Sequence, residues 1–139
     1  MKTIVALAVS IVLVSIFFCP VVMSAPSMPA DLQMVQPNPS LPKELSAFFG
    51  KWEGASGYMQ FFLIVEKIDN EKASVYWWQS KEVAGATAGW HRYEANVIKE
   101  GGKYKLWYLG PFGNNKLTVK GDNLDDATPE ATMRLKRVQ

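Results

Sequence analysis

The sequence has little of the side-chain chemistry on which metal sites and nucleophilic enzymes depend. Its 139 residues include one cysteine, Cys19, and one histidine, His91. A single cysteine excludes an internal disulfide and a multi-cysteine metal site. A single histidine excludes a metal site with several histidine ligands, and any catalytic triad would have to use His91 itself. We therefore expect a binding protein without metal or cofactor, and not an enzyme.

The chain also lacks a strong excess of charge. It has 15 Lys and Arg residues against 13 Asp and Glu residues, and the basic residues are scattered. This balance argues against recruitment to nucleic acid or to an anionic membrane surface. The apolar share of 48% is typical of one globular domain that can bury a core.

A long hydrophobic run occurs only at the N-terminus. Lys2 precedes a stretch from Ile4 to Cys19 that is apolar except for two serines, and Pro20 follows. This layout is typical of a secretory signal, and it predicts export to the periplasm or the extracellular space with cleavage after Ser24. An uncleaved anchor is the alternative, because the stretch approaches the roughly 20 residues that span a bilayer. Lipidation of Cys19 is disfavoured, because large residues precede it where small ones are usual.

The next segment is rich in proline. Five prolines lie between positions 26 and 42 among Ser, Asn and Gln, which argues against a helix or a strand. We assign residues 1–24 to the signal or anchor, 25–40 to a Pro-rich tether, and 41–139 to the folded domain. Pro42 and Glu44 suit the first turn of a short helix that runs to about Phe48 and stops at Gly50.

Beyond Gly50 the hydrophobic pattern has a period of two and is interrupted by short turns. This predicts an all-β domain, an antiparallel up-and-down barrel of about eight short strands preceded by the short helix. Short links leave no room for crossover helices, so strands adjacent in sequence should pair. The expected strands cover residues 50–56, 58–68, 73–80, 89–99, 103–109, 116–121, 123–126 and 131–138.

Alternation assigns the faces of these strands. In the first strand Trp52 shares a face with Gly50 and Gly54, so its indole projects between two bare positions where other strands can cover it. The inward residues of the fourth and fifth strands include His91, Tyr93, Tyr104 and Tyr108. The second strand is apolar on both faces, so we expect both to be covered.

The helix that runs into Gly50-x-Trp52, the meander of strands and the basic last strand resemble the calycin superfamily of lipocalins, fatty-acid-binding proteins and avidins. Segments 49–54, 63–68 and 73–76 are similar to small secreted bacterial lipocalin-like domains of unassigned role. The resemblance covers about residues 41–138. It implies that Trp52 packs against Arg137 as a structural barrel seam, which the antiparallel register permits, with Arg134 as the competing partner. The chain is shorter than full-length lipocalins, which argues against a spacious lipid cavity.

The excess of aromatic residues has three interpretations: barrel core, pocket or surface patch. As a pocket, His91, Tyr93, Tyr104 and Tyr108 would line one wall for a small hydrophobic molecule. The loop at residues 81–89 would form a lid or rim. Carriage or sensing of such a ligand is the leading prediction for function.

The runner-up is a protein-interaction or inhibitor module. Trp90 and Trp107 face outward on adjacent strands and are the candidates for its contact patch.

An enzyme of unknown type is the third option. His91 is more readily explained as a hydrogen-bonded wall residue than as a catalytic base. A membrane contact is expected only through an uncleaved N-terminus. The acidic run Asp122, Asp125, Asp126 and Glu130 suits a solvated turn better than a calcium loop.

Overall fold

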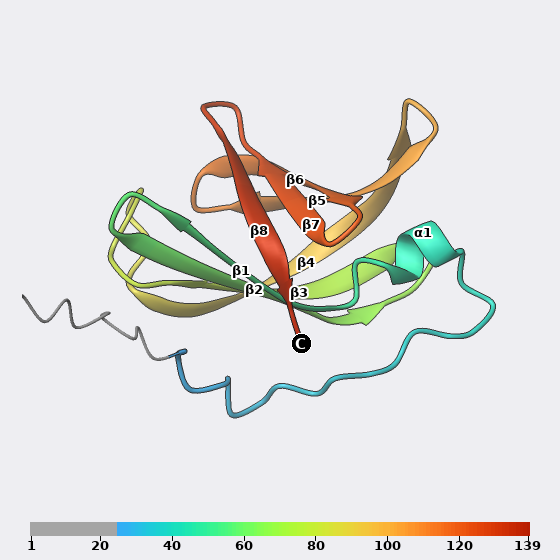
Figure 1. The fold of residues 1–139 in the computed structure, drawn as a ribbon, viewed down its shortest axis with the longest axis horizontal. Coiled ribbons are helices and arrows are strands. Elements are labelled where there is room, and N and C mark those ends of the chain that lie inside the picture. The colour runs from blue at the N-terminus through green and yellow to red at the C-terminus, as the bar shows by residue number, and fades with distance from the viewer. Residues whose placement is uncertain (1–24) are drawn as a thin grey trace, which may run out of the picture.

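The computed structural model describes residues 25–139, and the export signal expected over residues 1–24 lies outside them. The described residues form a closed barrel of eight antiparallel strands, preceded by one short helix (Figure 1). This confirms the all-β up-and-down fold. Helix α1 spans Lys43–Ser46, and the strands are β1 Gly50–Ser56, β2 Met59–Ile68, β3 Lys72–Gln79, β4 Gly89–Glu100, β5 Lys103–Gly110, β6 Gly113–Lys120, β7 Asn123–Ala127 and β8 Thr132–Val138. Among residues 25–139, no helix is long and apolar enough to cross a bilayer.

One strand begins earlier than its sequence predicts. Strand β6 starts at Gly113, three residues before the start at residue 116 that the sequence predicts. The hairpin turn lies at Pro111 and Phe112, where proline supplies the backbone angle that a turn requires. Asn115 therefore lies within the strand, directly opposite Tyr108 of β5.

The interior is filled by side chains. Large apolar residues from seven of the eight strands are at most 1% exposed: Trp52, Leu63, Val75, Trp77, Leu106, Leu117, Leu124 and Leu135. Each such side chain contributes about 1.5–3 kcal/mol to folding on burial. The positions of these buried residues follow the predicted alternation, because residues two positions apart in a strand, such as Val75 and Trp77, share the inner face.

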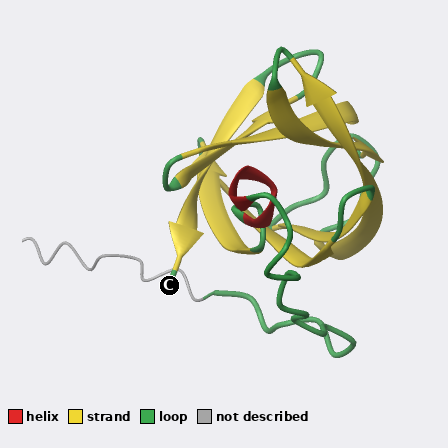
Figure 2. Ribbon diagram, turned by 90° about the vertical axis from the view of Figure 1, so that its right-hand side faces the viewer, coloured by secondary structure: helices red, strands yellow, loops and turns green. Residues whose placement is uncertain are grey.

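The two ends of the barrel differ. At one end, called the α1 end, Leu45 and Phe48 join the core and the helix sits within the ring of strands (Figure 2). The β2–β3, β4–β5 and β6–β7 turns also lie at this end, because consecutive strands alternate in direction. The opposite end, called the open end, carries the β1–β2, β3–β4, β5–β6 and β7–β8 connections.

Residues 27–35, called the strap, lie against the outer face of the barrel instead of forming a free tether (Figure 1). The backbone N–H groups of Gln33 and Val35 donate to the side chain and the carbonyl oxygen of Glu66, at 3.0 and 2.8 Å. The indole N–H of Trp90 donates to the carbonyl oxygen of Ser27 at 2.8 Å. The strap has no helix or strand, as its prolines predict. It therefore docks through single hydrogen bonds and not as a ninth strand.

Glu66 is available to the strap because of a β-bulge. The β2–β3 register shifts between Val65 and Lys67, so Glu66 pairs with no residue of the neighbouring strands. Glu66 is 3% exposed, and its carboxylate also accepts hydrogen bonds from Ser74 Oγ at 2.7 Å and from Arg92 at 2.6 Å. The bulge thus converts one position of β2 into the anchor of the strap.

The strap explains why β2 and β3 are apolar on both faces. Ile64 and Tyr76 point outward, opposite to the interior residues Leu63 and Val75, yet they are only 1% and 3% exposed. Tyr76 lies close to Asp31 of the strap, and burial together with this neighbour raises the pKa of its hydroxyl. Both faces of β2 are covered, as its sequence predicts.

Candidate functional site in the open half of the barrel

The open half of the interior differs from the α1 half in polarity. Four consecutive strands, β4 to β7, each place one side chain with a polar group on the same inner wall. These side chains are Tyr93, Tyr108, Asn115 and Asp126, called the polar wall.

The polar wall begins with two stacked tyrosines. The rings of Tyr93 and Tyr108 are 5.2 Å apart between centroids and inclined by 35°. Tyr108 is 1% exposed, whereas Tyr93 is half-buried. Burial raises the pKa of both hydroxyls, so both stay neutral at physiological pH and can donate a hydrogen bond.

The wall continues with an amide and a carboxyl. Asn115 Nδ2 donates to both oxygens of Asp126, at 3.0 and 2.9 Å. Asp126 is fully buried, and no basic side chain among residues 25–139 forms an ion pair with it. Burial therefore raises the pKa of its carboxyl to about 6, although the Asn115 amide and the nearby Tyr108 hydroxyl act in the opposite direction.

Two buried polar atoms of this wall lack a hydrogen-bond partner among the described residues. They are the Tyr108 hydroxyl, which lies near Asp126 without meeting hydrogen-bond geometry, and Asn115 Oδ1. A buried polar group without a partner destabilises a fold by about 1–3 kcal/mol. Such groups inside a barrel are candidates for contacts with a bound molecule.

The β3–β4 loop, residues 80–88, is held to the interior by side chains of the barrel. Gln79 Nε2 donates to the carbonyl oxygens of Ala86 and Thr87 at 2.9 and 3.3 Å, and His91 Nε2 lies 2.8 Å from Thr87 O. Gln79 Oε1 also accepts a hydrogen bond from Trp77. The loop is thus fastened at the open end through three bonds that do not involve the β-ladder.

The four predicted wall residues do not form one wall. Tyr93 and Tyr108 meet in the open half, and His91 lies at its rim against the loop. Tyr104 faces inward like Tyr108, but it lies four residues, or roughly 13 Å, along β5 toward the α1 end. There its ring contacts the ammonium group of Lys99 at 5.1 Å from the ring centroid.

The two outward tryptophans do not form a common patch. Trp107 is opposite Asn96 in the β4–β5 register, and Trp90 lies six residues before Asn96, roughly 20 Å along the strand. Trp90 is also half-buried beneath the strap through its bond to Ser27. The proposed contact surface is therefore divided between distant parts of the barrel.

The seam residues meet at the α1 end. Trp52 of β1 and Arg137 of β8 are directly opposite in the register, while Arg134 faces outward and binds Asp125.

The acidic run of β7 is divided between the two faces of the strand, because Asp125 faces outward and Asp126 faces inward. Among residues 25–139, no group of three His, Cys, Asp or Glu side chains is arranged to hold a metal ion.

Sequence reasoning missed Asn115 and Asp126. The acidic run predicts a solvated turn for Asp126, yet Leu124 is the apolar residue of β7, and the period of two places Asp126 on the same inner face. The predicted strand begins at residue 116 and leaves Asn115 outside it, whereas the structure places the turn at Pro111 and Phe112 and Asn115 within β6. The signal for Asp126 was present in the alternation, and the signal for Asn115 was hidden by the late start of the predicted strand.

Comparisons with models of known protein families, with characterised proteins and with solved structures find no match to this chain.

Proposed function

We propose that this protein is an exported, lipocalin-like binding protein that holds a small molecule at the open end of its barrel. The observation that carries the proposal is Asp126, a carboxyl buried inside the barrel without a basic partner. A buried acid of this kind destabilises the fold, so a role in binding accounts for it better than a role in packing.

The polar wall also suggests the type of ligand. Tyr93 and Tyr108 offer aromatic faces, and Asp126 and Asn115 offer oxygen acceptors beside them. The ligand would have a ring or an apolar body and a hydrogen-bond-donating group, such as an amine. It would be more polar than the purely hydrophobic molecule predicted from the sequence.

Entry would require the β3–β4 loop to move. The interior side chains fill the space, so a ligand enters only with a rearrangement at the open end, and in this proposal the bonds from Gln79 and His91 to the loop break. Loops of this kind commonly open and close over binding sites. In this proposal Gln79 and His91 release the loop and then face the bound molecule.

A matched pair of variants tests this proposal. The protein is incubated with a small-molecule extract of bacterial cells, and retained compounds are detected by native mass spectrometry. Wild type and Asp125→Asn should retain the same compound, because Asp125 faces outward, whereas Asp126→Asn should lose it. If wild type retains no compound, or if Asp126→Asn retains it as well as wild type, the proposal fails.

A protein-interaction role is the second candidate. Tyr58 and Leu109 are 77% and 67% exposed, and both lie at the rim of the open end. Exposed large apolar side chains at one end of a barrel can contact a partner. Replacing both residues with serine would abolish capture of a partner but leave small-molecule retention unchanged.

A further inference from the structure

A cleft lies at the α1 end, remote from the polar wall. It has a volume of about 520 Å³ and lies between helix α1, the β4–β5 hairpin and the end of β6. This volume falls within the range of roughly 300–1,000 Å³ that is usual for small-molecule sites.

The floor of this cleft is apolar. It includes the ring of Phe48, which is 1% exposed, and the half-buried side chains of Tyr104 and Val119. Phe48 belongs to the core and follows α1, and Tyr104 of β5 and Val119 of β6 pack against that core. The floor is therefore formed by the folded barrel and not by a mobile surface loop.

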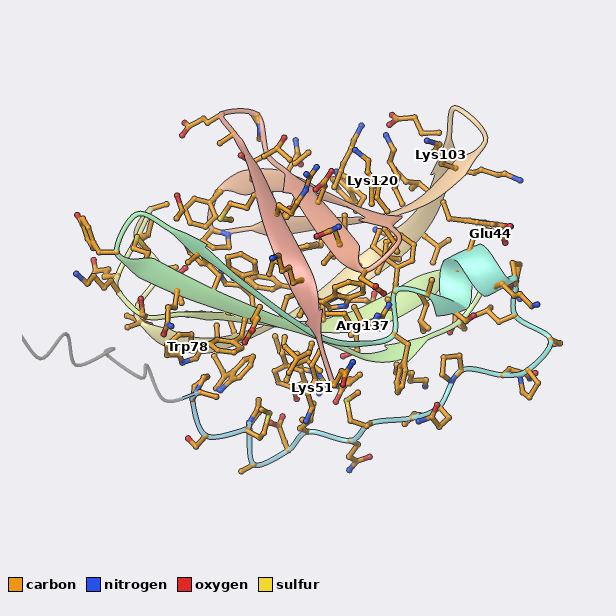
Figure 3. All side chains as sticks on the ribbon, viewed as in Figure 1. Glu44, Lys51, Trp78, Lys103, Lys120 and Arg137 are labelled. Carbon is orange, nitrogen blue, oxygen red and sulfur yellow. The ribbon has the colours of Figure 1, made fainter. Side chains whose placement is uncertain are left out.

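The rim of the cleft is basic. Lys99, Lys103 and Lys120 line it, and Glu44 is the one acid among its lining residues. In Figure 3, Lys103, Lys120 and Glu44 lie at the same end of the barrel, the end that carries α1. The lining therefore has a formal charge of +2 from three ammonium groups and one carboxylate.

Two of these ammonium groups are not neutralised by neighbours. Within residues 25–139, no carboxylate lies within the 4.0 Å ion-pair distance of Lys99 or Lys103. Lys120 pairs with Asp125 at 2.8 Å. By contrast, Lys105 and Lys116 on the same sheet both bind Glu100. In the described part of the chain, Lys99 and Lys103 thus leave two positive charges at the cleft without an ion-pair partner, although Lys51, Lys67 and Lys136 elsewhere on the barrel also form no ion pair.

We propose that this cleft binds an amphipathic organic anion. An apolar chain or ring would pack on Phe48, Tyr104 and Val119, and a single anionic headgroup would lie beside the ammonium groups of Lys99 and Lys103, which have no ion-pair partner among the described residues. Charge complementarity selects an anion, because an ammonium headgroup would be repelled by the same lysines. The site is independent of the proposed ligand of the polar wall.

Calorimetric titration with three probes tests this proposal. Decanoate represents an acyl-chain anion, 2-naphthoate represents an aromatic anion, and decyltrimethylammonium has the chain of decanoate with the opposite charge. At least one of the two anions should bind wild type more tightly than the cation does, and its affinity should fall with added salt. The stronger anion indicates whether the natural ligand is lipid-derived or aromatic.

Variants locate the binding. The double variant Lys99→Gln/Lys103→Gln should weaken binding of the anion about tenfold, as expected for two partly exposed charge interactions. The control variant Lys67→Gln/Lys136→Gln also removes two positive charges, but outside this cleft. Its affinity for the anion should stay within about twofold of the wild-type affinity. Asp126→Asn should also leave the affinity for the anion unchanged, which would show that the anion does not bind at the polar wall.

Three outcomes would overturn the proposal. One is that neither anion binds wild type more tightly than the cation. Another is that the Lys99/Lys103 variant binds the anion as wild type does. The last is that Asp126→Asn weakens anion binding, because this would place the ligand at the open end.

Discussion

The guanidinium group of Arg137 lies over the indole ring of Trp52, with 4.1 Å between its carbon atom and the ring centroid. The same guanidinium donates hydrogen bonds to the carbonyl oxygens of Ala47 and Phe49, at 2.6 and 3.0 Å, and the indole N–H donates to Phe48 O at 3.0 Å. A stacked pair of this kind contributes about 0.5–2 kcal/mol. The pair therefore joins β1 to β8 and joins both strands to the segment that follows α1.

Replacement of Trp52 tests the importance of this seam. Trp52→Ala should lower the free energy of unfolding by about 3–5 kcal/mol, because it removes a fully buried ring and leaves Arg137 without its stacking partner. Urea denaturation measures the change. Trp107→Ala, which truncates a half-buried outward ring, should have a clearly smaller effect. A loss below about 1 kcal/mol for Trp52→Ala would show that the ring is not central to the fold.

Asp126 should make stability depend on pH between about 4 and 6. Its pKa is 3.8 in the unfolded chain and about 6 in the folded one, so the folded protein keeps this proton over a range in which the unfolded chain has lost it. The free energy of unfolding should therefore fall as pH rises through this range, by up to about 3 kcal/mol, and stay lower above it. Urea denaturation at a series of pH values measures this slope.

Asp126→Asn should abolish this slope and should be more stable than wild type above pH 6. The outward acids Asp125 and Glu100 affect the free energy of unfolding in a lower pH range. Hydrogen bonds from Arg134 and Lys120 lower the pKa of Asp125 to about 2, and bonds from Lys105 and Lys116 lower that of Glu100 to about 2. The stability that these two ion-paired acids contribute is fully present at pH values above their unfolded pKa values, which are near 4. It is lost as the pH falls toward 2. An unchanged slope in Asp126→Asn would contradict the burial of this carboxyl.

Glu66 should control the docking of the strap. Glu66→Gln loses the charge that faces Arg92 and replaces one acceptor oxygen with a donor, so contacts to Gln33, Ser74 or Arg92 are lost. We expect a loss of about 1–3 kcal/mol and faster proteolysis within residues 25–36. Glu94→Gln is the control, since its exposed pair with Lys72 should contribute less than about 1 kcal/mol. Equal proteolysis of the two variants would show that Glu66 does not hold the strap.

The β3–β4 loop contains one strained residue. Val83 and Ala86 exchange two backbone hydrogen bonds, at 3.0 and 2.9 Å, around Ala84 and Gly85, which have φ values of 52° and 77°. A left-handed φ disfavours alanine, so Ala84→Gly should stabilise the protein by roughly 0.5–1 kcal/mol. Ala88→Gly in the same loop should be neutral or destabilising in the same thermal unfolding assay. Destabilisation by Ala84→Gly would contradict this turn.

Export remains a prediction from the N-terminal sequence. The hydrophobic run from Ile4 to Cys19 and the cleavage expected after Ser24 predict a mature chain that starts at Ala25. Intact-mass measurement of protein recovered from the periplasm or medium should give the mass of residues 25–139. Recovery of the full-length chain in the membrane fraction would instead establish an uncleaved anchor.

The sequence alone determined the barrel and most of its inner surface. Strands, turns and faces follow from local rules: a period of two assigns Trp52, Leu63 and Leu106 to the interior, and short connections require sequential antiparallel pairing. The same rules bring the first and last strands together, which is why the opposition of Trp52 and Arg137 could be anticipated.

Only the tertiary structure decided which of these side chains meet. The separation of Tyr104 from Tyr108 and of Trp90 from Trp107 depends on position along the barrel axis, which alternation does not specify. The strap docks because a bulge frees Glu66 to bind a segment 33 residues earlier in the chain. Asp126 became a candidate site because four strands bring it beside Asn115 and Tyr108 in a place that excludes water. Its raised pKa is thus a property of the assembled barrel, since burial comes from neighbours that are distant in sequence.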